Sequence, residues 1–343
     1  METKQLLLLS QIRESVDAAH SILITGQANP DGDSIGSQLA LYDILTQHVQ
    51  QVTAAPVEIV IANDELPAAQ YDFLPQIGSV TPFEAIQDRQ FDVGFILDGS
   101  RDRIGRVLPV LEKCRYAINI DHHRNRAPSA EQVAWIEPEM SSVAEMVYGF
   151  LEHPAWQAAL NPDIAACLYA GLIYDTGSFR YPSTTARTLE IAGKLIATGI
   201  DFARIAECLF LEKSFAAVQL LSAVLRNLQR TADGAIIWGT ITQALLAAVQ
   251  ATPNEEEGII TQYAFLKGGK VAVLFRELDQ EKIKVSFRAH GALDVGRFAQ
   301  KISAQGGGHP RAAGCTLSGT MHAVQETVIR ALTAELGNLA KTS

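Results

Sequence analysis

Short apolar runs alternate with longer stretches of helical spacing along the first half of the chain. In the longer stretches, apolar residues recur at every third or fourth position. This alternation is typical of α/β proteins, in which crossover helices join parallel strands. The sequence therefore predicts a parallel sheet with helices on both faces. We expect its strands at residues 21–25, 57–62, 91–97 and 116–120, and its helices at residues 34–47, 143–152 and 163–174.

The helix expected at residues 143–152 carries a start signal. Ser142 is followed three positions later by Glu145. This is the spacing of a capping box, in which each side chain bonds to the backbone amide of the other residue. The pair predicts that the helix begins directly after Ser142.

A different organisation follows residue 184. Leu and Ile at helical spacing continue to about Arg230, with a break at Gly199, and strand-like runs begin near Asp233. We expect strands at residues 235–242, 270–278 and 282–288, with a hairpin around Asp279 and Gln280, and then two helices separated by the glycine-rich segment Gly306–Gly314. We therefore divide the chain into an α/β domain at residues 1–190, a helical connector at 191–232 and a smaller α+β domain at 233–343, across a cleft from the first.

The composition is that of a well-folded acidic protein. Of the 343 residues, 48% are hydrophobic and 19% are charged, and the formal net charge is −10. A negative overall field repels polyanions, so counterion release cannot drive binding to long duplex nucleic acid. Any nucleic-acid substrate should therefore be short and captured by local cationic groups.

The cysteines and the apolar runs indicate in which cellular compartment the protein is expected. The four cysteines lie far apart without a C-x-x-C pair, unlike a disulfide framework or a zinc knuckle. The leucine run near the N-terminus is flanked by charges, and the longest apolar run, at residues 164–174, is shorter than the roughly 20 residues of a membrane span. We expect a cytoplasmic protein with no membrane partner.

Polar residues follow the predicted strands of the first domain. Ligands of open α/β sheets bind outside the carboxyl ends of the strands, so chemistry is expected at these positions. The strand at 21–25 is followed by Gly26-Gln27-Ala28-Asn29-Pro30-Asp31-Gly32-Asp33, the strand at 91–97 by Asp98, the strand at 116–120 by Asp121-His122-His123, and the helix at 163–174 by Asp175.

The carboxylates of this set need cations if they come together. Clustered carboxylates raise one another's pKa values unless positive charge offsets them. Two divalent ions could do so, and carboxylate oxygens with imidazole nitrogens suit Mn²⁺ best, with Mg²⁺ as the alternative. Two such ions activate a water molecule for attack on phosphorus. The sequence therefore predicts a two-metal phosphoesterase.

Each of these residues also has a plainer explanation. An Asp in an Asn-Pro-Asp-Gly turn is favoured by turn chemistry, and an Asp after a strand is often a helix N-cap. The functional interpretation is favoured because three of the sites fall at predicted strand ends, and the structural explanations treat each residue separately. The adjacent histidines His122 and His123 also have little packing logic after a buried strand.

Four segments together resemble the DHH phosphoesterase family with its DHH-associated C-terminal domain. They occur in the family's order over nearly the whole chain. The resemblance is closest to the bacterial branch of oligoribonucleases, or nanoRNases, and 3′,5′-adenosine-bisphosphate phosphatases. The segments are Asn29–Ser37 (NPDGDSIGS), Ile120–His123 (IDHH), Asp175–Phe179 (DTGSF) and Gly306–Gly314 (GGGHPRAAG).

The resemblance implies roles for the matching residues. His123 would stabilise charge or donate a proton at the scissile phosphate, and Asp121 would orient the motif from behind. Asp98 would be shared by both metal ions. The first ion would be held by Asp98, Asp31 and the first motif position, and the second by Asp33, Asp98, His122 and Asp175.

One position departs from the family pattern. The family has a His four residues before the first Asp of the D-x-D pair, and this chain has Gln27 there. A glutamine carbonyl is weaker than imidazole towards Mn²⁺ but acceptable to Mg²⁺ or Ca²⁺, which predicts a weakened or altered first site. Two alternatives stay open: Gln27 hydrogen-bonds within its loop while water replaces the ligand, or activity has been lost.

The glycine-rich segment and two arginines are candidates for binding substrate. By itself such a segment is as typical of a solvent turn as of an anion-binding loop. The resemblance implies that Arg288, Gly307, Gly308 and His309 grip a phosphate, base or sugar. Arg103 is a lesser candidate, because a solvated helix face explains it equally well.

The expected function is hydrolysis of short oligoribonucleotides from an end, of the 3′-phosphate of adenosine 3′,5′-bisphosphate, or of both. The alternatives are a phosphodiesterase for linear or cyclic dinucleotides, and a nucleotide-binding protein whose catalysis is impaired by Gln27. The expected partners are short RNA or nucleotides, and a homodimer is compatible with the sequence.

Overall fold

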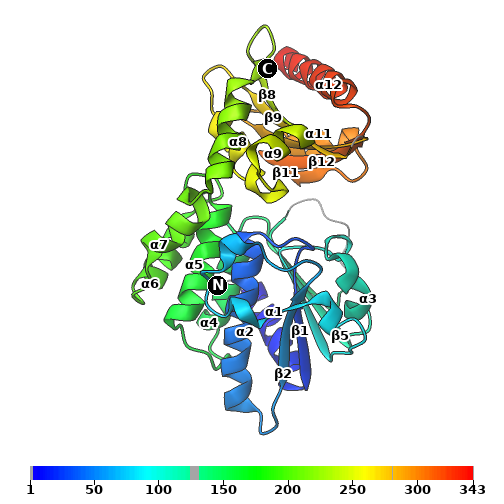
Figure 1. Ribbon diagram of the computed structural model, residues 1–343. Helices are drawn as coiled ribbons and strands as arrows, with labels where there is room; N and C mark the ends of the chain where they lie inside the picture. Colours follow the sequence, from blue (N-terminus) through cyan, green and yellow to red (C-terminus); the bar gives the residue numbers. More distant parts are fainter. Residues whose placement is uncertain (1–2, 124–130, 280, 343) are drawn as a thin grey trace. The chain divides into compact units, whose positions relative to one another are not determined.

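The computed structural model describes residues 3–123, 131–279 and 281–342. The chain folds as two compact units, Met1–Glu212 and Lys213–Ser343 (Figure 1). The boundary falls within the stretch 191–232, where a helical connector was expected. Each unit has its own sheet and its own buried core, and the predicted fold class is confirmed.

The first unit is built on a six-stranded parallel sheet of order β3-β2-β1-β4-β5-β6. The predicted strands are present, with ends shifted by two residues at most. Two short strands, β3 and β6, were not predicted. The strands are β1 (Ser21–Thr25), β2 (Glu58–Asn63), β3 (Val80–Pro82), β4 (Val93–Leu97), β5 (Tyr116–Asp121) and β6 (Val133–Ile136).

Both faces of this sheet are covered, but unequally. One face packs against long helices, with Ile22 and Ile24 of β1 in the shared core. The other face, which includes Leu23, is covered by the short helix α3 (Leu108–Leu111) and by 3₁₀ turns. The larger core contains α1 (Thr3–Asp17), α2 (Gly32–Val52), α4 (Val143–Glu152), α5 (Pro162–Asp175), α6 (Ala186–Ile196) and α7 (Phe202–Ala206).

Helices α2, α4 and α5 approach one another at glycines. A methyl group added at Gly36 of α2 would lie 2.5 Å from the carbonyl oxygen of Cys167 on α5. One added at Gly171 of α5 would lie 2.8 Å from the Cβ of Ala144 on α4 and 2.8 Å from Oδ1 of Asp33. Glycine inside a helix costs about 0.5–1 kcal/mol relative to alanine, so the close approach of the three helices accounts for these residues.

The start of α4 corrects one detail of the sequence interpretation. Oγ of Ser142 accepts a hydrogen bond from the amide of Glu145 at 3.1 Å, so Ser142 is the N-cap, as predicted. The carboxylate of Glu145, however, accepts from Ser141 and Thr188 instead of from the amide of Ser142. Only half of the expected capping box therefore forms, because Glu145 is buried and bonds away from the cap.

The second unit is a six-stranded mixed sheet of order β11-β12-β10-β9-β8-β7, with helices on both faces. The pair β8–β9 is parallel and the other pairs are antiparallel. The predicted hairpin is β9–β10, with Gln280 outside the described residues. The strands are β7 (Gln229–Arg230), β8 (Ile236–Ile241), β9 (Val271–Asp279), β10 (Lys282–Ala289), β11 (Gly307–His309) and β12 (Ala312–Ser318).

Alternate residues of the central strand β9 face the two helical layers of this unit. Val271, Val273 and Phe275 pack in the core with α11 (Val295–Ile302) and α12 (Met321–Thr342). Ala272 and Leu274 pack in the opposite core, with α8 (Phe215–Arg226), α9 (Gln243–Val249) and α10 (Ile259–Ala264).

The glycine-rich segment is not the simple separator of two helices that the sequence suggested. Strands β11 and β12 lie between α11 and α12 and pair antiparallel, with Gly307 opposite Gly314. Strand β11 escapes detection because it consists of Gly307, Gly308 and His309, and glycine has little strand propensity. Most of the segment is therefore ordered sheet.

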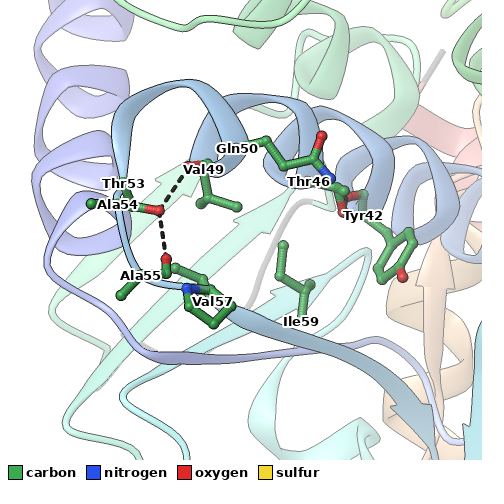
Figure 2. Close-up of a pocket in the computed structure, with 10 residues that line it drawn as sticks. Tyr42, Thr46, Val49, Gln50, Thr53, Ala54, Ala55, Val57 and Ile59 are labelled. Carbon is green, nitrogen blue, oxygen red and sulfur yellow. Dashed lines mark hydrogen bonds between the residues drawn. The ribbon is translucent and has the colours of Figure 1, made fainter.

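One surface groove lies away from the acidic residues. Figure 2 shows a groove of about 430 Å³ lined by the C-terminal end of α2 and the beginning of β2. Thr53 closes its edge, and Oγ1 donates to the carbonyl oxygens of Val49 and Ala55. This groove lies at the amino ends of the strands, whereas the acidic residues follow their carboxyl ends.

No single helix of the described ranges has the length and apolar character to cross a bilayer, although the bent pair Phe202–Leu211 and Phe215–Arg226 passes that test jointly.

Candidate metal centre

The centre lies where the strand order of the first sheet reverses, between β1 and β4. Loops leaving adjacent strands in opposite directions open a crevice at this point. Asp98 directly follows β4, and its Oδ2 accepts a hydrogen bond from Nε2 of Gln27, in the loop after β1, at 2.9 Å. Gln27 thus faces Asp98 with its amide nitrogen.

The backbone of Asp98 turns sharply while staying attached to the sheet. Its φ angle is +56°, a left-handed conformation that Asp tolerates better than most residues. Its amide donates to the carbonyl of Ile120 on β5 at 3.0 Å. The side chain is thereby directed from a fixed point at the sheet edge.

One oxygen of Asp98 faces both histidines. Nδ1 of His123 lies 3.5 Å and Nε2 of His122 lies 3.7 Å from Oδ1 of Asp98. Asp98 is 1% exposed, and among the described residues this oxygen has no hydrogen-bond partner. A buried carboxylate oxygen without a donor is costly, and a bound cation would remove that cost.

His122, Asp175 and Asp33 form one possible ligand group. Nε2 of His122 lies 2.9 Å from Oδ2 of Asp175, the last residue of α5. One ligand atom from each of the three residues lies within 4.8 Å of the others. Nδ1 of His122 is 3.3 Å from the carbonyl oxygen of Met140, which leaves Nε2 for the centre.

The carboxylate of Asp33 is held at the N-terminus of α4. Oδ2 accepts from the amide of Val143 at 2.6 Å, and Oδ1 accepts from the amide of Ala144 at 2.9 Å and from Oγ of Ser37 at 3.3 Å. The first amides of a helix lack partners within the helix and favour an anion. Asp33 therefore joins α2 to α4 while remaining next to His122.

His123 and Asp121 form a pair beside Asp98. Nδ1 of His123 lies 2.7 Å from Oδ1 of Asp121, which also accepts from the amide of His123 at 3.2 Å. One ligand atom from each of Asp98, Asp121 and His123 lies within 4.8 Å of the others, making a second possible ligand group. Because Asp121 is fully buried, it fixes the ring of His123 from behind.

Asp31 combines two of the roles considered from the sequence. Its Oδ1 accepts from the amides of Asp33 and Ser34, both at 3.1 Å, so Asp31 is the N-cap of α2. It also lies within electrostatic reach of Asp98, since its charge contributes to raising the pKa of Asp98. Capping does not remove Asp31 from the centre.

The carboxyl groups of the centre have raised pKa values, because they are buried close to one another. Burial, then the charges of Asp31, Asp33, Asp175 and Asp121, raise the pKa of Asp98 well above its usual value. Burial and the charge of Asp175 likewise raise the pKa of Asp33.

The pKa of His122 is also raised. Burial acts to lower the pKa of His122, but its hydrogen bond to Asp175 and the charges of Asp175, Asp33 and Asp121 outweigh burial and raise that pKa to about 9. Like the raised pKa values of Asp98 and Asp33, this shift reflects an excess of negative charge in the centre. Oxygen and imidazole donors around an excess of negative charge fit divalent cations of the Mn²⁺ and Mg²⁺ type.

A strained turn holds Asp175. After α5, three successive residues, Gly177, Ser178 and Phe179, have φ angles of +56°, +59° and +63°. Left-handed conformations at non-glycine residues cost about 1–3 kcal/mol each and cluster at functional sites. Thr176 supports the turn, because its Oγ1 accepts from the amide of Phe179 at 3.1 Å.

Sequence reasoning missed a buried polar network under the Gln27 loop. The amide of Gly26 donates to Oδ1 of Asn63, Nδ2 of Asn63 donates to Oε1 of Gln38, and Nε2 of Gln38 donates to Oγ of Ser34, at 2.9, 2.9 and 3.1 Å. The signal was available, because Asn63 directly follows the strand predicted at 57–62, as Asp98 follows the strand predicted at 91–97. The network fixes the backbone before Gln27.

The arginine and glycine-rich candidates have distinct placements. Arg288 on β10 and His309 on β11 are both paired with Ala312 of β12, so they lie in one row across three strands and on one face of the sheet. Nη1 of Arg288 donates to the carbonyl of Phe287 at 3.0 Å. Arg103 is exposed, and its carbonyl oxygen accepts from the amide of Ala28 at 2.8 Å.

The two central glycines of the segment can be separated by substitution. A methyl group at Gly308, where φ is +137°, would lie 2.5 Å from the carbonyl oxygen of Ala312, whereas one at Gly307 meets nothing within 4 Å. Gly308→Ala should therefore lower the free energy of unfolding by about 2 kcal/mol or more. Gly307→Ala should leave it nearly unchanged, as measured by urea unfolding. Equal destabilisation by both variants would contradict this assignment.

Comparisons with known proteins identify the family of this chain. A family model described as "DHH family, N-terminal domain" matches residues 21–172, and one described as "DHHA1 domain" matches residues 242–338. Together they span more than half of the chain. The chain belongs to the DHH family. The resemblance found from the four sequence segments is thus confirmed, and with it the enzyme class, a phosphoesterase.

Relatives of this DHH protein extend over almost its full length. It is 26% identical to the Bacillus subtilis bifunctional oligoribonuclease and PAP phosphatase NrnA, covering 90% of this chain and 93% of that protein. It is also 26% identical to the Thermus thermophilus protein of the same name, covering 97% and 95%. An exopolyphosphatase-related protein from Bacteroides fragilis has the same fold, with a TM-score of 0.84 at 24% identity over 97% of this chain and 96% of that one.

Proposed function

We propose that this DHH-family phosphoesterase hydrolyses short oligoribonucleotides from one end and removes the 3′-phosphate of adenosine 3′,5′-bisphosphate. The observation that carries the proposal is the buried group of carboxylates and imidazoles around Asp98, at the strand ends. The names of the NrnA relatives support the choice of substrate. The net charge of −10 favours short substrates over long polyanions.

Two divalent cations, Mn²⁺ in preference to Mg²⁺, are proposed as cofactors. Bound there, they would supply Lewis acidity and a nucleophile at neutral pH. Asp98 is proposed as the shared ligand because its Oδ1 has no donor among the described residues. The first ion would be held by Asp98, Asp31 and the carbonyl oxygen of Gln27, whose amide would turn from its present Nε2 bond to Asp98. The second ion would be held by Asp98 with Asp33, His122 and Asp175.

His123 is proposed to act on the substrate. Asp121 binds its Nδ1 at 2.7 Å, and we propose that Nε2 donates a hydrogen bond or a proton to a phosphate oxygen. A buried carboxylate behind the ring fixes the orientation of the ring. Asp121 therefore supports His123 without contacting the substrate.

The second unit is proposed to bind the rest of the substrate. Arg288 and His309 offer a guanidinium and an imidazole from one face of the sheet, suited to a phosphate and to a base or sugar. The open space beside Gly307 admits a close ligand. Arg103 is a weaker candidate because its side chain is exposed on a 3₁₀ turn.

A cyclic or linear dinucleotide is the second candidate substrate. The Bacillus subtilis cyclic-di-AMP phosphodiesterase GdpP is 24% identical over 90% of this chain, which spans 46% of that protein. The lower coverage and the full-length NrnA relatives favour oligoribonucleotides.

A substrate panel tests the proposal. The purified full chain, with Mn²⁺ or Mg²⁺, would be incubated with di- to pentaribonucleotides, adenosine 3′,5′-bisphosphate and cyclic dinucleotides, and the products separated by chromatography. We expect turnover of the short RNAs and of the bisphosphate. Preference for a cyclic dinucleotide would replace the proposal with the second candidate, and tight binding without turnover in either metal would indicate a nucleotide-binding protein.

Gln27 is tested by changing its ligand chemistry. Gln27→His should raise Mn²⁺ affinity by about tenfold relative to Mg²⁺, because imidazole prefers Mn²⁺ over harder cations. Calorimetric titration with each ion, alongside the rate of hydrolysis, measures this. Gln27→Ala is the matched control, because affinity equal to that of wild type would mean that the amide is only a hydrogen-bond donor to Asp98. If the His variant changes neither affinity nor rate, Gln27 has no part in the first site.

A further inference from the structure

Two of the proposed ligands depend on one short backbone segment. The carbonyl oxygen of Met140 is 3.3 Å from Nδ1 of His122. The amides of Val143 and Ala144 donate to Asp33 at 2.6 and 2.9 Å. The segment from Met140 to Ala144 therefore sets the tautomer of His122 and the position of the Asp33 carboxylate.

This segment follows β6 and includes the first two residues of α4, Val143 and Ala144. The amide of Met140 donates to the carbonyl oxygen of Glu137 at 3.0 Å, and the next residue, Ser141, is held by the carboxylate of Glu145. Oε2 of Glu145 accepts from the amide of Ser141 at 3.2 Å, from Oγ of Ser141 at 2.5 Å and from Oγ1 of Thr188 at 3.1 Å. Nε of Arg187 lies 3.5 Å from Oε1.

Glu145 is unusual for a glutamate in the first turn of a helix. It is 2% exposed, and burying a carboxylate is costly unless hydrogen bonds satisfy it. Three donors on one oxygen and an arginine by the other offset that cost. Ordinary helix capping would have placed the carboxylate near the amide of Ser142, so the observed contacts serve the preceding segment instead.

We propose that Glu145 is a positioning residue for the metal centre, which holds the segment Met140–Ala144 and through it the ligands Asp33 and His122. The inference rests on the proposed metal centre and adds to it a residue that touches neither ion nor substrate. Partners that orient metal ligands from behind typically contribute about 10- to 100-fold to metal affinity or activity.

Direct measurement of Mn²⁺ affinity tests this role without depending on any substrate. Free Mn²⁺ would be followed by electron paramagnetic resonance while it is titrated into the full chain. Glu145→Ala should weaken Mn²⁺ binding by about 10- to 100-fold. Glu145→Gln should recover part of the loss, because its amide oxygen can still accept from Ser141.

A matched control lies on the same helix. Glu152 of α4 pairs with Arg187 and Lys194 at 2.6 and 3.6 Å, so Glu152→Gln removes a charge from α4 and a partner from Arg187 without touching the segment. Its Mn²⁺ affinity should equal that of wild type. If Glu145→Ala does not fold, Ser141→Ala is the substitute, because it removes only the 2.5 Å hydroxyl bond, and it should weaken Mn²⁺ binding several-fold.

The outcomes separate this inference from the proposed function. Folded Glu145 variants, or Ser141→Ala, with wild-type Mn²⁺ affinity would overturn the positioning role, whatever the substrate. A Glu152→Gln variant as weak as Glu145→Ala would also overturn it, since the effect would then belong to α4 as a whole. Wild type that binds Mn²⁺ but leaves all oligoribonucleotides intact would overturn the substrate proposal alone.

Discussion

Replacing Asp98 with Asn should abolish hydrolysis and at the same time make the metal-free protein more stable. The rate should fall by about 10³-fold or more, because a ligand shared by two ions contributes more than the 10- to 100-fold of an outer partner. The stability should rise because the substitution removes a buried negative charge whose Oδ1 has no donor among the described residues. If that charge costs about 1 kcal/mol, the thermal midpoint rises by roughly 2–4 °C.

Differential scanning fluorimetry with and without Mn²⁺ measures both parts. Wild type should be stabilised by Mn²⁺, since a ligand that binds only the folded state raises the unfolding midpoint, whereas Asp98→Asn should not respond. Retained Mn²⁺ stabilisation in Asp98→Asn would contradict its role as shared ligand.

Asp92 provides the matched control, because it precedes β4 at the amino ends of the strands, whereas Asp98 follows β4 at the carboxyl ends. Its Oδ2 accepts from the amides of His20 and Ser21 at 2.8 and 3.1 Å, and the His20 amide bond is the main cause that lowers the pKa of Asp92. A lowered folded-state pKa means that the ionised form stabilises the fold above its usual pKa of 3.8, and that this stabilisation is lost as pH falls through the lowered value. Asp92→Asn should therefore lower the midpoint at pH 7 and leave Mn²⁺ stabilisation intact, the opposite of Asp98→Asn.

Substitution of His123 should separate catalysis from metal binding. His123→Ala should reduce kcat by about 10²–10⁴-fold, the usual contribution of a positioned proton donor, while Mn²⁺ affinity changes little. The neighbouring His122→Ala should instead weaken Mn²⁺ binding, because Nε2 of His122 lies beside Asp175. Single-turnover rates and Mn²⁺ titration on both variants check this.

The proposed role of His123 also predicts a smaller loss of kcat when its partner Asp121 is substituted. Asp121→Asn keeps an oxygen that can accept from Nδ1 of His123 but removes the charge, so its loss of kcat should be smaller than that of His123→Ala. Loss of Mn²⁺ binding in His123→Ala as large as in His122→Ala would place His123 among the metal ligands.

The strand ends of the first sheet were accessible to sequence reasoning. The apolar runs before Gln27, Asp98 and Asp121 are buried on both faces, and the rule that ligands gather at carboxyl ends locates the polar residues after them. Nothing local in the sequence shows that the chain order reverses between β1 and β4. That reversal is a property of the whole sheet, and it is what brings Gln27 to Asp98.

Other features depended on tertiary contacts. The spacing of Ser142 and Glu145 suggested a capping box, but burial against Thr188 redirected the glutamate. Gly36 and Gly171 look like weak points of helices until the close approach to neighbouring helices is seen. The short strand β11 was missed because antiparallel pairing with β12, and not propensity, makes Gly307–His309 a strand.

The close approach of α2 and α5 has a consequence for ion size. Asp33 lies at the start of α2 and Asp175 at the end of α5, so the separation of these two carboxylates is set by backbone packing at Gly36 and Gly171. Mg²⁺ requires ligand distances near 2.1 Å, whereas Ca²⁺ accepts about 2.3–2.6 Å. We therefore expect the ionic radius that the centre accepts to be governed by helix spacing, so that relatives with larger residues at these two positions would favour larger ions.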